Sequence, residues 1–174
     1  MADDALVGID LGTTNSAIAW MTPDGIPEVL PNAEGQRITP SVVQVRTDGS
    51  TLVGDLAKRE IALEKENTAQ FFKRDMGTAS TYEYSGRAWT PTDLSAEVLK
   101  KLKTDAEAAL GRDVRRAIIT VPAYFQDAAR IATLKAGQQA NLEVLQIINE
   151  PTAASLAYGE GKNKDAKIVV FDLG

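Results

Sequence analysis

The last third of the chain alternates short apolar runs with helical stretches, and this alternation restricts the fold more than any other feature of the sequence. Continuous apolar or β-branched runs occupy residues 117–121, 144–148 and 167–171, and helical patterns separate them at residues 127–140 and 151–158. Runs of this kind are typical of strands that are buried on both faces of a sheet and connected through helices. The sequence therefore predicts an α/β layer.

The two ends of the chain share one short pattern, an apolar strand followed by Asp-Leu-Gly. The first strand ends at Asp10 and opens into Gly-Thr-Thr-Asn at residues 12–15, and the second strand ends at Asp172. A Gly-Thr-Thr turn offers N–H groups and hydroxyls to phosphate oxygens, and a carboxylate at a strand end can hold a hydrated magnesium ion. The pattern indicates a duplicated phosphate-binding hairpin whose second copy is cut short, although Asp-Leu-Gly is also an ordinary strand end with a turn glycine.

The rest of the chain predicts an antiparallel start and an inserted segment. Strands are expected at residues 6–11, 17–20 and 28–30, then a strand at 41–46 and a short helix at 55–64. Thr90, Pro91 and Asp93 form a helix start, and an apolar face follows until Gly111 ends the helix. The simplest architecture is one mixed sheet built from the N-terminal hairpin and the C-terminal strands, with residues 38–111 inserted as a smaller α+β subdomain.

Composition excludes several kinds of active site. The 174 residues contain no cysteine and no histidine, which removes thiolate chemistry, Ser-His-Asp triads and HExxH zinc sites. The net charge is −5 and the basic residues are scattered, which argues against a nucleic-acid or anionic-membrane surface. Neither GxxxxGK[ST] nor GxGxxG occurs, and there is no basic leader or long apolar run, so a cytoplasmic location is expected.

Polar residues fall where strands of the predicted sheet end. Ligands of open α/β sheets collect at the carboxyl ends of the strands, and Asp10, Glu150 and Asp172 lie there. Asp10 and Asp172 would repel each other unless a cation lay between them, which favours a hydrated divalent ion. A second interpretation stays open on these grounds alone: Glu150 only stabilises a helix N-terminus, and Lys73 is an ordinary surface cation.

Five motifs in this order and spacing resemble the DnaK-type heat-shock chaperone family. They are Gly-Ile-Asp-Leu-Gly-Thr-Thr-Asn-Ser at 8–16, Asn-Thr at 67–68 with Phe-Lys-Arg at 72–74, Thr-Val-Pro-Ala-Tyr-Phe at 120–125, Ile-Ile-Asn-Glu-Pro-Thr-Ala-Ala at 147–154, and Phe-Asp-Leu-Gly at 171–174. The resemblance runs from about Leu6 to the last residue. It implies an actin-like, ribonuclease H-like ATPase fold in which this chain is the first lobe of the nucleotide-binding domain. Residues 1–37 and 112–174 would form the inner subdomain and 38–111 the outer one, and the second lobe and the peptide-binding domain would be absent.

The resemblance also implies which residues bind the nucleotide and its ions. ATP or ADP would be held at the phosphates by the hairpin. Magnesium and potassium, with their waters, would be positioned by the strand-end carboxylates, with Glu150 holding a magnesium-bound water. The residues concerned are Gly12, Thr13, Thr14 and Asn15 for the phosphates, and Asp10, Glu150 and Asp172 for the metal.

The resemblance also implies which residues take part in catalysis and in signalling. Lys73 resembles the lysine that orients the attacking water and offsets charge on the γ-phosphate, acting with Asp10, Thr13, Glu150 and Asp172. Pro122 and Arg130 resemble the proline switch and its arginine, which relay the nucleotide state to the substrate-binding domain. The chain alone is expected to be a poor ATPase.

The partners implied by the resemblance are a nucleotide, a J-domain co-chaperone and a nucleotide-exchange factor, with no nucleic acid and no membrane. Gln146 stands where the family commonly has an arginine used in J-domain contact, and Leu134-Lys135 replaces a Lys-Asp pair near the relay helix. These departures concern the co-chaperone and the relay rather than nucleotide chemistry. The alternatives are a sugar or acetate kinase of the same superfamily and an actin-like filament-forming protein.

Overall fold

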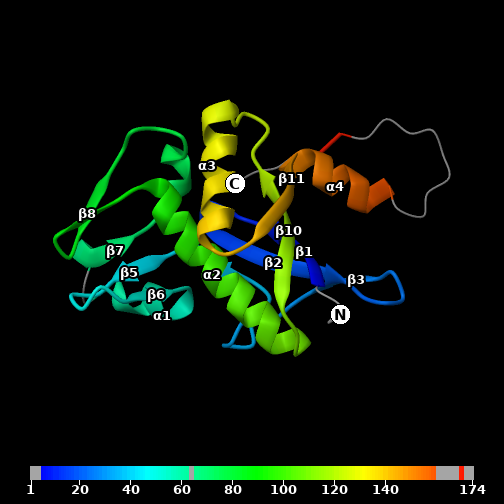
Figure 1. Ribbon diagram of the computed structural model, residues 1–174, viewed down its shortest axis with the longest axis horizontal. Helices are drawn as coiled ribbons and strands as arrows, with labels where there is room; N and C mark the ends of the chain where they lie inside the picture. The colour runs from blue at the N-terminus through cyan, green and yellow to red at the C-terminus, as the bar shows by residue number, and fades with distance from the viewer. Residues whose placement is uncertain (1–4, 63–64, 160–168, 171–174) are drawn as a thin grey trace.

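The computed structural model describes residues 5–62, 65–159 and 169–170, and its centre is a mixed sheet with helices packed against it (Figure 1). Three strands run parallel to one another: β11 (Glu143–Asn149), β10 (Val114–Val121) and β1 (Ala5–Asp10). The sheet continues with the antiparallel strands β2 (Asn15–Met21) and β3 (Pro27–Val29), and β4 (Thr39–Pro40) also pairs with β2. The predicted mixed sheet of N-terminal hairpin and C-terminal strands is confirmed.

Two helices cover one face of this sheet and bury its apolar side chains. Helices α2 (Pro91–Leu110) and α3 (Asp127–Gln139) pack side by side across the strands (Figure 1). Along β1 the side chains alternate, so that Val7 and Ile9 are buried while Leu6 and Asp10 are exposed. A Cβ atom on Gly137 would lie 2.3 Å from the Val144 side chain, which shows how closely α3 approaches β11.

Helix α2 begins and ends where the sequence predicts. The Thr90 hydroxyl accepts the Asp93 N–H and the Asp93 carboxylate accepts the Thr90 N–H, which is a capping box. Gly111 ends the helix in the left-handed conformation, with φ of 66°. Leu94, Leu99 and others on one face of the helix are fully buried, because α2 packs against both the large sheet and the smaller elements.

The segment between β4 and α2 forms small elements. A three-stranded sheet consists of β5 (Val43–Val45), β6 (Thr51–Val53) and β7 (Thr68–Ala69), with helix α1 (Asp55–Glu60) beside it. The hairpin β8 (Tyr82–Tyr84) and β9 (Arg87–Trp89) and the 3-10 turns η1 (Lys65–Asn67) and η2 (Phe72–Asp75) complete it. One apolar cluster runs from the large sheet through α2 into this segment, and the division into inner and outer subdomains stays a prediction.

Two expectations about strands need correction or lie outside the structure. Buried and half-buried side chains alternate along most of β10, and no side chain of β11 is fully buried, so burial on both faces is wrong for these runs. The reason is that α2 and α3 cover one face, and β11 lies at an edge of the described sheet. Of the strand expected at residues 167–171, only Val169 and Val170 are described.

The last helix, α4 (Glu150–Gly159), follows β11 directly and contacts β10 and β11. It begins at Glu150, one residue before the predicted helical stretch. Within the described ranges, none of the helices combines the length and the apolar character needed to cross a membrane.

Candidate functional site

Three strands end at one edge of the sheet and bring the predicted site residues together. The register pairs Asp10 with Thr120, and Val121 with Asn149, so Asp10, Pro122 and Glu150 lie at the same edge. The Thr120 hydroxyl donates a hydrogen bond of 2.9 Å to the Asp10 carboxylate. Asp10 itself is exposed, so its second oxygen can face a ligand over the sheet edge.

Lys73 reaches this edge from the inserted segment. Its Nζ lies 2.7 Å from Glu150 Oε1, across 77 positions of sequence, and Lys73 is only 4% exposed. The same ammonium group lies 5.6 Å from the centre of the Phe125 ring, within the range of a cation–π interaction. Lysine is almost never this buried without a partner, so the surface interpretation of Lys73 is wrong.

The local backbone explains how Lys73 is aimed. Phe71 has φ of 59°, a left-handed conformation that is uncommon for an aromatic residue, and the η2 turn follows it. Phe72 then enters the apolar core while Lys73 points to Glu150. Glu150 also opens α4, where a carboxylate favours the positive end of the helix dipole. The helix-start interpretation of Glu150 agrees with its place at the beginning of α4, and its role toward a metal stays a prediction.

The hairpin between β1 and β2 has no space for a side chain at Gly12. A Cβ atom on Gly12 would lie 1.9 Å from the Asn15 carbonyl oxygen. Thr13 and Thr14 line a small pocket of about 30 Å³, together with Lys58 and Gln70. That volume holds about two water molecules, so this pocket does not enclose a nucleotide.

Arg130 connects two of the strand ends. Its Nε donates a 3.1 Å hydrogen bond to the Phe125 carbonyl, and its guanidinium also bonds the Asn149 side-chain oxygen. The Phe125 N–H in turn donates to the Pro122 carbonyl. The turn that begins at Pro122 is thus tied to the residue preceding Glu150.

The donor chemistry of this edge suits magnesium. Among the described residues, no three acidic side chains lie close enough to hold an ion directly, and Asp172 lies outside them. Magnesium usually keeps several waters and uses one or two carboxylates plus phosphate oxygens, so it needs no cage made only of protein. Asp10 and Glu150 are two carboxylates at the same sheet edge, which is the type of ligand that such a hydrated ion uses.

Comparison with known proteins gives a family for the whole chain. The family described as "Hsp70 protein" matches residues 6–83 and 79–174. The chaperone protein DnaK of Thermotoga petrophila is 58% identical over 170 residues, which is 97% of this chain and 28% of that relative. The DnaK proteins of Thermosipho africanus and Thermosipho melanesiensis are 56% and 54% identical with the same coverage. The chain belongs to the Hsp70 family.

Membership settles several expectations. The mixed sheet belongs to the actin-like ATPase fold of the nucleotide-binding domain of Hsp70 proteins, and the kinase and filament alternatives are not favoured. The chain spans 28% of the length of the curated relatives, as a fragment would.

Two buried serines of this Hsp70-family chain have no role predicted from the sequence, although Ser16 closes the motif at residues 8–16. Ser16 and Ser41 are 1% and 2% exposed and lie beside Gly12. Ser16 shares the inward face of β2 with Ile18, since the two are separated by one residue, and that periodicity is a signal that could have identified it. Ser41 carries no such signal, because only tertiary structure brings it to the hairpin.

Proposed function

We propose that this chain is the first lobe of the ATP-binding and ATP-hydrolysing domain of a DnaK-type chaperone, which couples ATP hydrolysis to protein folding. The observation that carries the proposal is the buried Lys73–Glu150 ion pair at the sheet edge that also bears Asp10. The pair at 2.7 Å, largely shielded from water, holds the positive charge of the ammonium group in a fixed position at this edge. Such a charge suits a reaction in which negative charge shifts between phosphate oxygens.

The hairpin would bind the phosphates and the strand ends would hold the metal. Gly12, Thr13, Thr14 and Asn15 would bind the phosphates, and the Thr13 and Thr14 hydroxyls would supply donors to the phosphate oxygens. Asp10, Glu150 and Asp172 would hold magnesium mostly through water, with potassium as a second ion. Bound magnesium would neutralise charge on the phosphates.

The chemical step would rest on positioning rather than on a covalent intermediate. Lys73 would orient the attacking water and offset charge on the γ-phosphate, with Glu150 fixing the lysine in place. The side-chain oxygens of Asp10 and Thr13 would border the same site. A chain without histidine is suited to this mechanism, because the protein supplies geometry and charge.

The relay and the partners of the full protein are further proposals. Pro122 and Arg130 would transmit the nucleotide state, which the bonds from Arg130 to Phe125 and Asn149 support. A J-domain co-chaperone and a nucleotide-exchange factor are the proposed protein partners, and the cytoplasm is the proposed location. Residues 1–37 and 112–174 are the proposed inner subdomain, and 38–111 the outer one.

The test compares Lys73→Ala with the unchanged sequence in a nucleotide-binding domain completed by the second lobe of a DnaK-type relative. We expect ATP binding to persist and single-turnover hydrolysis to slow by about 10²-fold or more, because the charge acts chiefly in the transition state. Lys100→Ala is the matched control, since Lys100 pairs with Glu97 on the exposed face of α2. An unchanged hydrolysis rate in Lys73→Ala would rule out the assigned role.

A further inference from the structure

Three hydrogen bonds form a closed ring around the first residue of the phosphate hairpin. The Gly12 N–H lies 3.1 Å from Ser16 Oγ, the two serine oxygens lie 2.9 Å apart, and Ser41 Oγ lies 2.8 Å from the Gly12 carbonyl oxygen. Both serine side chains are buried. The ring therefore begins and ends on Gly12, shielded from water.

The single proton on each serine hydroxyl determines which group donates in each of the three hydrogen bonds. A hydroxyl carries a single proton, and Ser41 uses it on the Gly12 carbonyl, which can only accept. Ser41 must then accept from Ser16, while Ser16 accepts the Gly12 N–H and donates onward. Bonds that run head to tail in a water-poor site polarise and strengthen one another.

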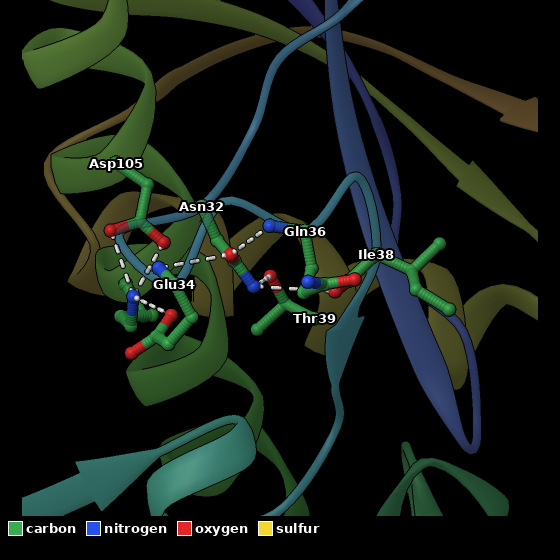
Figure 2. Close-up of polar contacts among 7 residues, drawn as sticks. Asn32, Glu34, Gln36, Ile38, Thr39 and Asp105 are labelled. Carbon is green, nitrogen blue, oxygen red and sulfur yellow. Dashed lines mark hydrogen bonds and ion pairs between the residues drawn. The ribbon is translucent and has the colours of Figure 1, made fainter.

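The segment that carries Ser41 is itself fixed in place. The Ser41 N–H donates 2.9 Å to the Thr14 carbonyl, and β4 pairs with β2 just before it. Upstream, the Asn32 amide donates to the Ile38 carbonyl and the Thr39 hydroxyl and accepts from the N–H groups of Glu34 and Gln36 (Figure 2). Lys101 on α2 pairs with Glu34 of this loop at 3.3 Å and with Asp105 of its own helix. The loop thus delivers Ser41 to the hairpin in one position.

We infer that Ser16 and Ser41 are positioning residues that fix the shape of the phosphate-binding hairpin, an inference that rests on the proposed function. The ring occupies both backbone groups of Gly12, so Gly12 supplies shape rather than a donor. The Thr13 and Thr14 hydroxyls make no hydrogen bond with any described residue and stay available to phosphate oxygens. Loss of the ring loosens the turn from which those donors project.

The first experiment tests the ring itself in the 174-residue chain, by NMR measurement of hydrogen exchange at the Gly12 amide. Ser16→Ala removes the acceptor and should accelerate exchange about tenfold, and Ser41→Ala should accelerate it several-fold. Both variants break the shared Ser16–Ser41 bond, so the double variant should show less than the product of the two single effects. Ser95→Ala, which removes a fully buried hydroxyl in α2, should leave Gly12 unchanged. A Gly12 exchange rate in Ser16→Ala equal to that of the wild type would show that the ring does not form. A double variant whose effect equals the product of the two single effects would show the same.

The second experiment tests the positioning role by Mg-ATP titration, followed at the Thr13 and Thr14 amide signals. We expect the Kd to rise about tenfold in Ser16→Ala and Ser41→Ala and to stay unchanged in Ser95→Ala. Ser41→Cys should fall between serine and alanine, because a thiol is a weaker donor and acceptor of similar shape. This graded rescue also serves if an alanine variant does not fold.

The outcomes separate the inference from the function on which it rests. Equal Kd values in wild type and all folded variants would overturn the positioning role and leave the proposed function intact. If the Thr13 and Thr14 amide signals of the wild-type chain do not shift at millimolar Mg-ATP, nucleotide binding by the hairpin is refuted. The positioning role is then refuted with it. The first result requires that the unmutated protein binds Mg-ATP and the second that it does not, so the two failures cannot be confused.

Discussion

At the scale of single residues, one buried charge pair carries a desolvation cost that lowers the stability of the fold. Removing an ammonium group from water costs on the order of several kcal/mol, and the attraction to a carboxylate at close range offsets part of that cost. Lys73 meets Glu150 at 2.7 Å beside the Phe125 ring, which provides that partner and a favourable aromatic face. A costly feature of this kind at the end of a strand is typical of a functional site rather than of a structural core.

Gln146 gives a prediction at the same scale. It is exposed on β11, where a partner can reach it. In the chain completed to full DnaK-type length, Gln146→Arg should increase J-domain stimulation of ATP hydrolysis, because arginine adds a permanent charge and up to five donors. The gain should be largest at low ionic strength, where screening is weakest. Equal stimulation of both proteins across a salt series would show that this position does not matter for the partner.

At the scale of elements, the N-terminus of α2 sets a pH-dependent contribution to stability. Burial alone would raise the pKa of the Asp93 carboxyl, but hydrogen bonds from Thr90 and Gln139 and the charge of Arg87 outweigh burial and lower this pKa below 3.8. A lowered folded-state pKa stabilises the protein above the unfolded pKa, and the contribution disappears as pH falls through the folded value.

Thr90→Ala tests this cap. We expect the free energy of unfolding to fall by about 1 kcal/mol at pH 7, because the hydroxyl that accepts the Asp93 N–H and donates to the Asp93 carboxylate is lost, while the backbone N–H of residue 90 still donates to that carboxylate. The difference from wild type should shrink as Asp93 becomes protonated in acid. Urea unfolding at pH 7 and at a series of lower pH values measures both, with Thr92→Ala in the same helical turn as the control. A deficit that persists unchanged in acid would exclude the carboxylate as its source.

The loop between β3 and β4 depends on one side chain. Asn32 makes four side-chain hydrogen bonds, and Thr39, one of its partners, is buried. Asn32→Ala should lower the free energy of unfolding by about 1–3 kcal/mol, because buried polar groups lose their partners. Gln36→Ala is the control, since it keeps the backbone N–H that bonds Asn32 and its own side chain is exposed. Equal urea midpoints for the two variants would contradict the role of Asn32.

At the scale of the whole molecule, the family resemblance implies a nucleotide site that is shared between two lobes, each with a phosphate hairpin. We expect the 174-residue chain to fold but to bind Mg-ATP with a Kd weaker than about 1 μM, that is, less favourably than about −8 kcal/mol. Isothermal titration calorimetry measures this value, and the same chain joined to a DnaK-type second lobe is the comparison. Equal, submicromolar affinities of the two proteins would show that the second lobe is not required.

The sequence by itself determined the features that depend on neighbouring residues. Thr90, Pro91, Asp93 and Gly111 define α2 because capping and backbone preferences act within one helical turn. The mixed sheet and the Gly-Thr-Thr hairpin follow from apolar periodicity and turn glycines in the same way. Recognition of the family came from motifs of this local kind.

Only the tertiary structure decided which distant residues meet. Lys73 lies 77 positions from Glu150, and Ser16 lies 25 positions from Ser41, so no local pattern could reveal either contact. The left-handed Phe71 that aims Lys73 also opposes local preference, because an aromatic side chain disfavours positive φ. Burial of β10 and β11 was likewise overestimated, since an apolar run does not reveal which face a helix will cover. Packing between segments far apart in sequence supplies that information, and it is this packing that forms the ion pair and the serine ring.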